Sequence, residues 1–231
     1  MTAVNIPLKF EEGAVFHDQM ILMTRDLRRR TLATHMPVLY VRQSPTAEPL
    51  LAEIGEYNGY INVSQDRADG EIEILIPSDI TQAYSWTSAW YNLELWKFSA
   101  AATLSNPDTT NYHYITVAVA GKTLTVTNVA GAADPKPFAA LVNGDFIYLS
   151  ASGTAYNNNG VGRVDTVTDG SGGGIGDIVT FQNTIRGISN VDNFDIQAQV
   201  LTFVGGEHIR ILEGSCRLSR EVVRTTPAES P

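Results

Sequence analysis

The sequence has a single cysteine, Cys216, among 231 residues. One thiol excludes an intramolecular disulfide framework and any metal cluster built from several cysteines. The residues around it have strand character. We therefore expect Cys216 to be a buried, unreactive thiol and not a catalytic nucleophile.

Long apolar runs and excess positive charge are also missing. No apolar stretch approaches the roughly 20 residues of a membrane-spanning helix, and the first ten residues lack the charged and apolar regions of a secretory signal. The 16 Lys and Arg residues face 25 Asp and Glu residues, which gives a net charge of −9. Because negative charge repels phosphate, we expect a soluble, cytoplasm-made protein that binds no nucleic acid and does not insert into membranes.

Recognisable catalytic patterns are scarce. The sequence has no GxSxG motif, and its four histidines have no metal-ligand spacing: His17, His35, His113 and His208. The glycine-rich residues 169–177 precede a strand pattern, which predicts a flexible hairpin loop and not a phosphate-binding loop. The pairs Glu71/Glu73 and Asp165/Asp169 fit the solvent face of a strand better than a glycosidase pair. We expect no catalytic residue, no metal and no cofactor.

Short alternating apolar runs bounded by turn residues predict an all-β protein with sandwich or barrel architecture. The expected strands are residues 38–42, 60–64, 71–76, 91–97, 114–119, 123–128, 146–150, 161–168, 178–182, 200–204 and 208–212. Residues 80–84 after Pro77 predict one short helix, with Ser78 or Asp79 as its cap. Residues 90–97 and 207–212 have the pattern of paired strands.

Composition changes abruptly in the middle of the chain. Residues 104–203 contain eight Asp and no Glu, together with twelve of the nineteen Gly, whereas the flanking segments hold all twelve Glu. We interpret this shift as one β domain inserted into another, because the ends of a domain usually lie close together on its surface. The predicted antiparallel β-sandwich host comprises residues 1–103 and 204–225, the β-barrel or β-sandwich insert comprises 104–203, and 226–231 form a flexible tail.

Two clusters are candidate assembly contacts. The first is a run of arginines, Arg25, Arg28, Arg29 and Arg30, whose position in a loop predicts either docking on an acidic neighbour or simple solvation. The second comprises the tryptophans Trp86, Trp90 and Trp96. We expect Tyr91, Leu93 and Leu95 to line the core while tryptophans close the sandwich end or meet another subunit. Stacking on sugar rings is the alternative for these tryptophans.

The host segments resemble a known family. The segments that carry the resemblance are residues 10–13, 15–23, 37–42, 69–74, the WYNLEL segment at 90–95 and the IRILEGSCRLSREVVR ending at 209–224. In this order they resemble the N-terminal β-sandwich domain of upper-baseplate proteins of tailed bacteriophages, over residues 6–98 and 205–225. The inserted residues depart from that pattern, as do Cys216 and Arg217, which replace small β-formers.

The insert has a resemblance of its own. Residues 142–149 (VNGDFIYL), 157–160 (NNNG) and 161–167 are similar to small β-barrel modules of phage tail and neck proteins. Gly144-Asp145 and Asn159-Gly160 are expected to form turns.

Together the resemblances imply a non-enzymatic virion protein, an oligomeric adaptor in a tail, baseplate or neck. Its partners would be copies of itself and other virion proteins. The alternatives are a capsid decoration protein and a carbohydrate-binding module that recognises the host.

Overall fold

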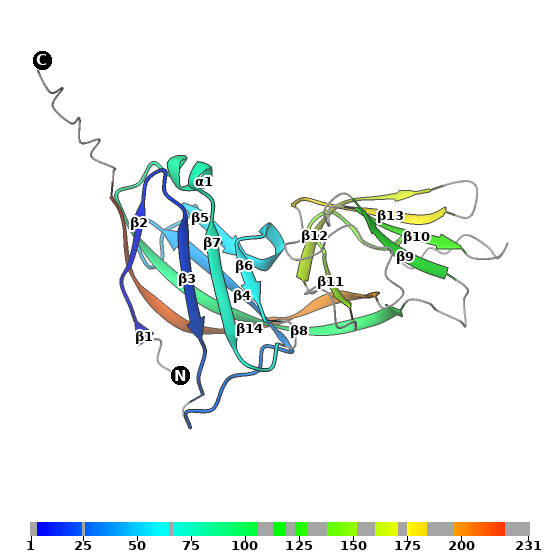
Figure 1. The fold of residues 1–231 in the computed structure, drawn as a ribbon, viewed down its shortest axis with the longest axis horizontal. Helices are drawn as coiled ribbons and strands as arrows, with labels where there is room; N and C mark the ends of the chain where they lie inside the picture. The colour runs from blue at the N-terminus through cyan, green and yellow to red at the C-terminus, as the bar shows by residue number, and fades with distance from the viewer. Residues whose placement is uncertain are drawn as a thin grey trace, which may run out of the picture.

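Strands form almost all of the regular structure in the computed structural model, which describes residues 4–24, 26–64, 67–105, 113–118, 123–128, 138–151, 160–170, 175–183 and 196–219. Within these ranges there are fourteen strands, one 3₁₀ turn, η1 (Glu56–Asn58), and one helix, α1 (Ser78–Gln82) (Figure 1). The prediction of an all-β fold is confirmed.

The proximal module is a sandwich of two sheets. The larger sheet has the order β5-β4-β8-β14, and β1 and β2 run parallel to β14 along its other edge. The smaller sheet has the order β3-β7-β6. The bounds of these strands are β1 (Val4–Asn5), β2 (Leu8–Glu11), β3 (Phe16–Ile21), β4 (His35–Arg42), β5 (Ala52–Gly55), β6 (Ile61–Val63), β7 (Glu71–Ile76), β8 (Ser88–Ser105) and β14 (Ile196–Ser219).

The core of this sandwich follows from strand alternation. On β7, Ile72, Ile74 and Ile76 are fully buried while the intervening glutamates point outward. The predicted core residues of β8, Tyr91, Leu93 and Leu95, are buried in the same cluster. Successive side chains of a strand face opposite sides, so the two sheets bury their facing sides in this core. The other face of the large sheet is buried in part by a second apolar cluster at the junction with the distal module, formed by Met36, Val38, Tyr57, Phe98 and Val161.

The distal module continues the same hydrogen-bonded path from β14 through β11, β12, β13, β10 and β9. The bounds are β9 (His113–Ala118), β10 (Thr123–Asn128), β11 (Phe146–Ala151), β12 (Gly160–Asp169) and β13 (Ile175–Phe181). Its buried side chains include Ile147, Leu149 and Phe181. The predicted hairpin after residue 169 is confirmed by the antiparallel pairing of β12 with β13, and residues 171–174 lie outside the described ranges.

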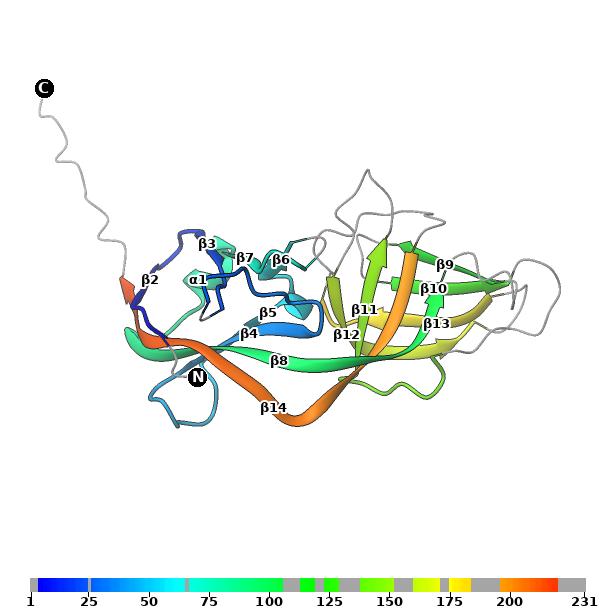
Figure 2. The same cartoon turned by 90° about the horizontal axis from the view of Figure 1, so that it is seen from below.

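Two long strands, β8 and β14, belong to both modules. Figure 2 shows them running side by side along both modules. The predicted pairing of residues 90–97 with 207–212 is confirmed, with His208 opposite Trp96 and Arg210 opposite Glu94. The expected insertion boundary at 104 is the second-last residue of β8, and the boundary at 203 lies inside β14, where the register with β8 shifts between Phe203 and His208. Independent folding of residues 104–203 stays a prediction.

The short helix is confirmed, but its expected cap is wrong. Pro77 occupies the N-cap position of α1, and no side chain there accepts a capping hydrogen bond. Ser78 and Asp79 lie inside the first turn, one and two residues beyond the position from which a side chain caps. Thr81 anchors the helix instead, because its hydroxyl donates to the carbonyl of Ala14 at 2.7 Å.

Candidate functional site

Charged and aromatic side chains lie together on one side of β4, β8 and β14, the side opposite the main core of the sandwich. The register places Tyr40 opposite Asn92 and Arg42 opposite Trp90, and it places Arg210 opposite Glu94. We call this surface the polar-aromatic face. It comprises Tyr40, Arg42, Trp90, Asn92, Glu94, Trp96, His208, Arg210 and Glu213.

A bulge in β14 shapes this face. The register with β8 shifts between Arg210 and Leu212, so one additional residue is accommodated on β14. An extra residue in one strand changes which side chains share a side of the sheet. Arg210 and Glu213, three residues apart, therefore lie on the same side and form an ion pair at 3.3 Å.

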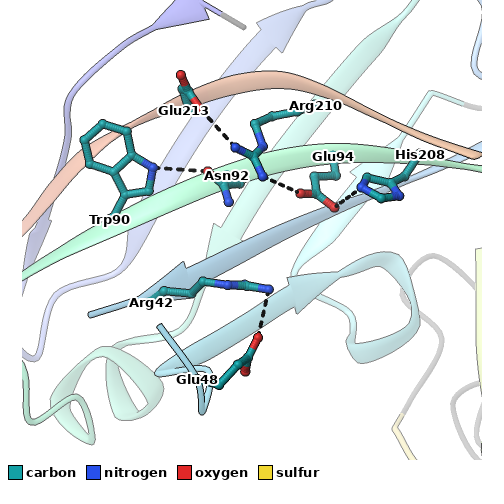
Figure 3. Close-up of polar contacts among 8 residues, drawn as sticks. All are labelled: Arg42, Glu48, Trp90, Asn92, Glu94, His208, Arg210 and Glu213. Atoms are coloured by element: carbon teal, nitrogen blue, oxygen red, sulfur yellow. Dashed lines mark hydrogen bonds and ion pairs between the residues drawn. The ribbon is translucent and has the colours of Figure 1, made fainter. Parts of the chain in front are cut away.

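Ion pairs connect β8 with β14 on this face, whereas Arg42 of β4 pairs separately with Glu48 (Figure 3). The carboxylate of Glu94 lies 3.5 Å from an Arg210 nitrogen and 3.9 Å from Nε2 of His208. Nε1 of Trp90 donates to Oδ1 of Asn92 at 3.2 Å. Asn92 and Glu94 are buried although they point away from the core, because the larger side chains around them cover them. Asn92 and Glu94 at the centre of the face are thus held by their contacts, while His208 and Arg210 beside them are exposed.

The aromatic side chains lie partly buried among these charges. The ring of Trp96 stacks on His208 with 5.8 Å between ring centroids, and Tyr40 lies 6.4 Å away on the other strand. The guanidinium of Arg42 lies 5.1 Å from the centre of the Tyr40 ring and 3.3 Å from Glu48. Such tryptophan, tyrosine and arginine side chains are the types enriched at protein interfaces.

A cleft of about 200 Å³ opens beside the polar-aromatic face, at the junction with the distal module. Its lining residues are Met36, Val38, Tyr40, Glu53, Tyr57, Trp96, Phe146 and Arg163. Burial, followed by a hydrogen bond that its hydroxyl donates to Glu53, raises the pKa of Tyr57. Burial also raises the pKa of Tyr40, with Glu53 and Glu94 adding to the effect. Both phenols therefore keep their protons at neutral pH.

A buried ion pair lies behind this cleft and connects the two modules. The Arg67 guanidinium donates to both carboxylate oxygens of Glu56, at 2.7 and 2.9 Å. It also donates to the carbonyls of Leu32 and His35. The rings of Phe98 and Tyr148, from β8 and β11, lie 5.9 and 5.3 Å from its central carbon. This arrangement is structural, since every polar atom of the pair is engaged inside the protein.

The predicted arginine cluster lies in a defined turn. Arg28 and Arg29 are exposed, Arg30 is partly buried, and Arg25 lies outside the described residues. The backbone amide of Thr24 donates to the carbonyl of Arg28 at 2.7 Å, and Met23 pairs with Arg29 in an isolated bridge. The three consecutive arginines therefore do not share one exposed surface, because Arg30 is partly buried.

The three predicted tryptophans do not lie together. Trp86 is 9 % exposed and packs in the proximal core against Phe10 and Tyr84, with centroid separations of 5.7 and 5.4 Å. Trp90 and Trp96 lie on the polar-aromatic face, on the opposite side of the large sheet. Of the three, Trp90 and Trp96 are therefore placed where a partner can reach them.

The described residues offer little for metal or thiol chemistry. They contain no group of three or more His, Cys, Asp or Glu side chains placed to hold a metal ion. Cys216 is fully buried, and burial raises the pKa of its thiol to about 12. The expected burial of this thiol is confirmed. Within the same ranges, no helix has the length and apolar character required to span a bilayer.

Several buried or inward-facing charged residues in the structure were not predicted from the sequence. Nothing in the local pattern marks Glu56 and Arg67 as partners, because they come from a short turn and a loop. Asp18 was detectable: it alternates with Phe16 and Met20, so strand periodicity places its carboxylate on the buried side of β3. The glutamates of β7 were interpreted correctly as a solvent face, where Glu73 accepts from His17 at 3.0 Å.

Comparison with known proteins adds no identification. No protein-family model matches the chain, and no curated protein matches its sequence.

Proposed function

We propose that this chain is a non-enzymatic structural component of a tailed-phage virion, made in the bacterial cytoplasm and assembled as an oligomeric adaptor in the tail, baseplate or neck. The resemblance of residues 6–98 and 205–225 to upper-baseplate domains supports the class of particle. The long paired strands β8 and β14 support the adaptor role, because they join two β modules without an intervening loop on either strand.

The polar-aromatic face is the observation that carries the proposal. Glu94 and Glu213 form ion pairs with Arg210, whose side chain is exposed, and the two tryptophans of the face are half-buried. A broad, preformed face of this composition suits a repeated contact between protein copies on a symmetric ring. Its partners would be copies of this chain and other virion proteins.

Genetic complementation of the phage tests this proposal. A phage that lacks the gene is supplied with the wild-type chain, with Arg210→Glu, or with Asp165→Lys as a control on the exposed surface of the distal module. We expect the wild type and the control to be found in purified particles by mass spectrometry, and Arg210→Glu to be depleted. Purified infectious particles without the wild-type chain would contradict the proposal.

A capsid decoration protein is the alternative within the same class, and labelling of the capsid instead of the tail would favour it. Carbohydrate recognition is the alternative from another class, favoured by the cleft in which Tyr40, Tyr57, Trp96 and Phe146 surround Glu53 and Arg163. Titration with monosaccharides, followed by tryptophan fluorescence, separates the two classes. Saturable binding that is lost in Trp96→Ala would favour the sugar-binding function.

A further inference from the structure

Exposed apolar side chains are concentrated in the first part of the chain, within the proximal module. Among the described residues, eight large hydrophobic side chains are substantially exposed, and six of them belong to the first 27 residues. These six are Val4, Ile6, Val15, Ile21, Met23 and Leu27. Leu27 has the largest exposed fraction of these six.

Leu27 is the most exposed of them and has an unfavourable backbone conformation. Its side chain is 80 % exposed, and its φ of 58° lies in the left-handed region that leucine rarely adopts. The turn is fixed by hydrogen bonds between Thr24 and Arg28. Within this chain the leucine gains no burial in return for this conformation, so the turn presents an apolar side chain to the surroundings.

A complementary cavity lies between the two sheets of the same module. It has a volume of about 230 Å³, larger than the roughly 150 Å³ of an apolar cavity that takes up benzene. Its walls are formed by side chains of β2, β3, β4, β8 and β14 and by Ile6, which is 43 % exposed. The lining residues are Ile6, Leu8, Asp18, Gln19, Met20, Leu39, Tyr91, Leu93 and Leu212. An exposed leucine side chain fits a space of this size and character.

One carboxylate lines this apolar cavity. Asp18 lies on the inward side of β3, between Phe16 and Met20, and in the described part of the chain its carboxylate accepts only from the amide of Gln19. Burial raises the pKa of the Tyr91 phenol to about 12, with smaller contributions from Cys216 and Asp18. An inward carboxylate beside apolar walls favours a cation that arrives together with an apolar group.

We propose that the turn at Leu27 of one copy docks into the cavity at Asp18 of a second copy, with Leu27 against the apolar walls and Arg28 or Arg29 paired with the carboxylate. A second copy is the partner because one chain carries both halves of the contact: a leucine flanked by arginines, and an apolar cavity containing an aspartate. This inference deepens the proposed adaptor function by naming a partner, but it requires no particular position in a virion.

Sedimentation of the purified full-length chain over a range of concentrations tests the contact. We expect the wild type to self-associate and Leu27→Asn to weaken association by about tenfold or more. Asparagine tolerates the left-handed region, so Leu27→Asn should unfold at or above the wild-type temperature. Val142→Asn, which changes another exposed apolar residue in the distal module, is the control and should associate normally.

A charge exchange identifies the partner groups. Asp18→Arg and Arg28→Asp/Arg29→Asp should each weaken association, and the triple variant that combines them should recover it. A wild type that stays monomeric, a Leu27→Asn chain that associates like the wild type, or a combined variant without recovery would overturn the contact. The presence of the wild-type chain in purified particles is a separate measurement, so failure of this inference is distinguishable from failure of the proposed function.

Discussion

At the scale of single residues, the Arg67–Glu56 ion pair stands out because both of its charges are buried. Both side chains are almost fully buried, and the bidentate geometry with two further backbone carbonyls compensates for the loss of water around the guanidinium. Removal of one partner from such a pair leaves an uncompensated charge in a poorly solvated place. The sequence could not reveal this pair, because burial depends on how η1, β8 and β11 come together.

Replacement of Glu56 by glutamine should therefore be severe. We expect Glu56→Gln to lower the free energy of unfolding by about 3–5 kcal/mol. The matched control is Glu48→Gln, which removes the partner of Arg42 at an exposed position and should cost less than about 1 kcal/mol. Urea unfolding followed by fluorescence measures both values, and similar losses for the two variants would contradict the role given to the buried pair.

His35 should make stability depend on pH. Burial, followed by Arg30, Lys97 and Arg67, lowers the pKa of His35 below its usual 6.5. As the pH falls below 6.5, the unfolded chain binds a proton that the folded chain resists, so stability decreases with falling pH. We expect the wild type to lose more stability than His35→Gln between pH 7 and pH 5 in urea unfolding. Parallel pH profiles would show that His35 does not contribute.

At the scale of elements, alternation predicted most strands well. The expected strands at 71–76 and 123–128 match β7 and β10 residue for residue, because each has a clear apolar face and clean turn signals. Residues 200–204 and 208–212 were expected as two strands, since Gly205 and Gly206 resemble a turn, but they belong to the single strand β14. Pairing with β8 on both sides of the glycines maintains that strand, and such long-range pairing leaves no local signal.

The two faces of the large sheet should respond differently to loss of a tryptophan ring. Trp86→Ala should lower the free energy of unfolding by about 3–5 kcal/mol, because Phe10 and Tyr84 pack against the buried ring. Trp90→Ala should cost less than half as much, since this ring is only half-buried on the polar-aromatic face. Chemical unfolding of both variants gives the comparison. An equal or larger loss for Trp90→Ala would mean that its role is core packing.

At the scale of the whole molecule, composition indicated two β modules but could not predict that the paired strands β8 and β14 join them. The shift from Glu to Asp and Gly falls on residues 104–203, and the division of the chain at these positions stays a prediction. The connection depends on the pairing of β8 with β14, which extends on both sides of residue 203. The role of Trp90 and Trp96 as assembly contacts stays a prediction, and the structure places both rings, partly buried, on the polar-aromatic face. Their charged neighbours come from strands distant in sequence, so only the fold could assemble them.

Excision of the distal segment tests the modular organisation. We expect residues 104–203, and the remaining host segments joined by a short linker, to unfold cooperatively as separate proteins, because each module has its own buried apolar residues. Calorimetry of the two purified pieces measures this. Absence of a cooperative transition in both pieces would show that the shared strands make the modules inseparable.

The position of this chain in an imaged virion tests the central claim most directly. Electron cryomicroscopy of particles from the phage that encodes it should show density for both β modules, repeated around the tail, baseplate or neck axis. The polar-aromatic face should lie against a neighbouring protein in that density. Intact particles in which no density fits the proximal sandwich, together with absence of the chain from their protein content, would contradict the account.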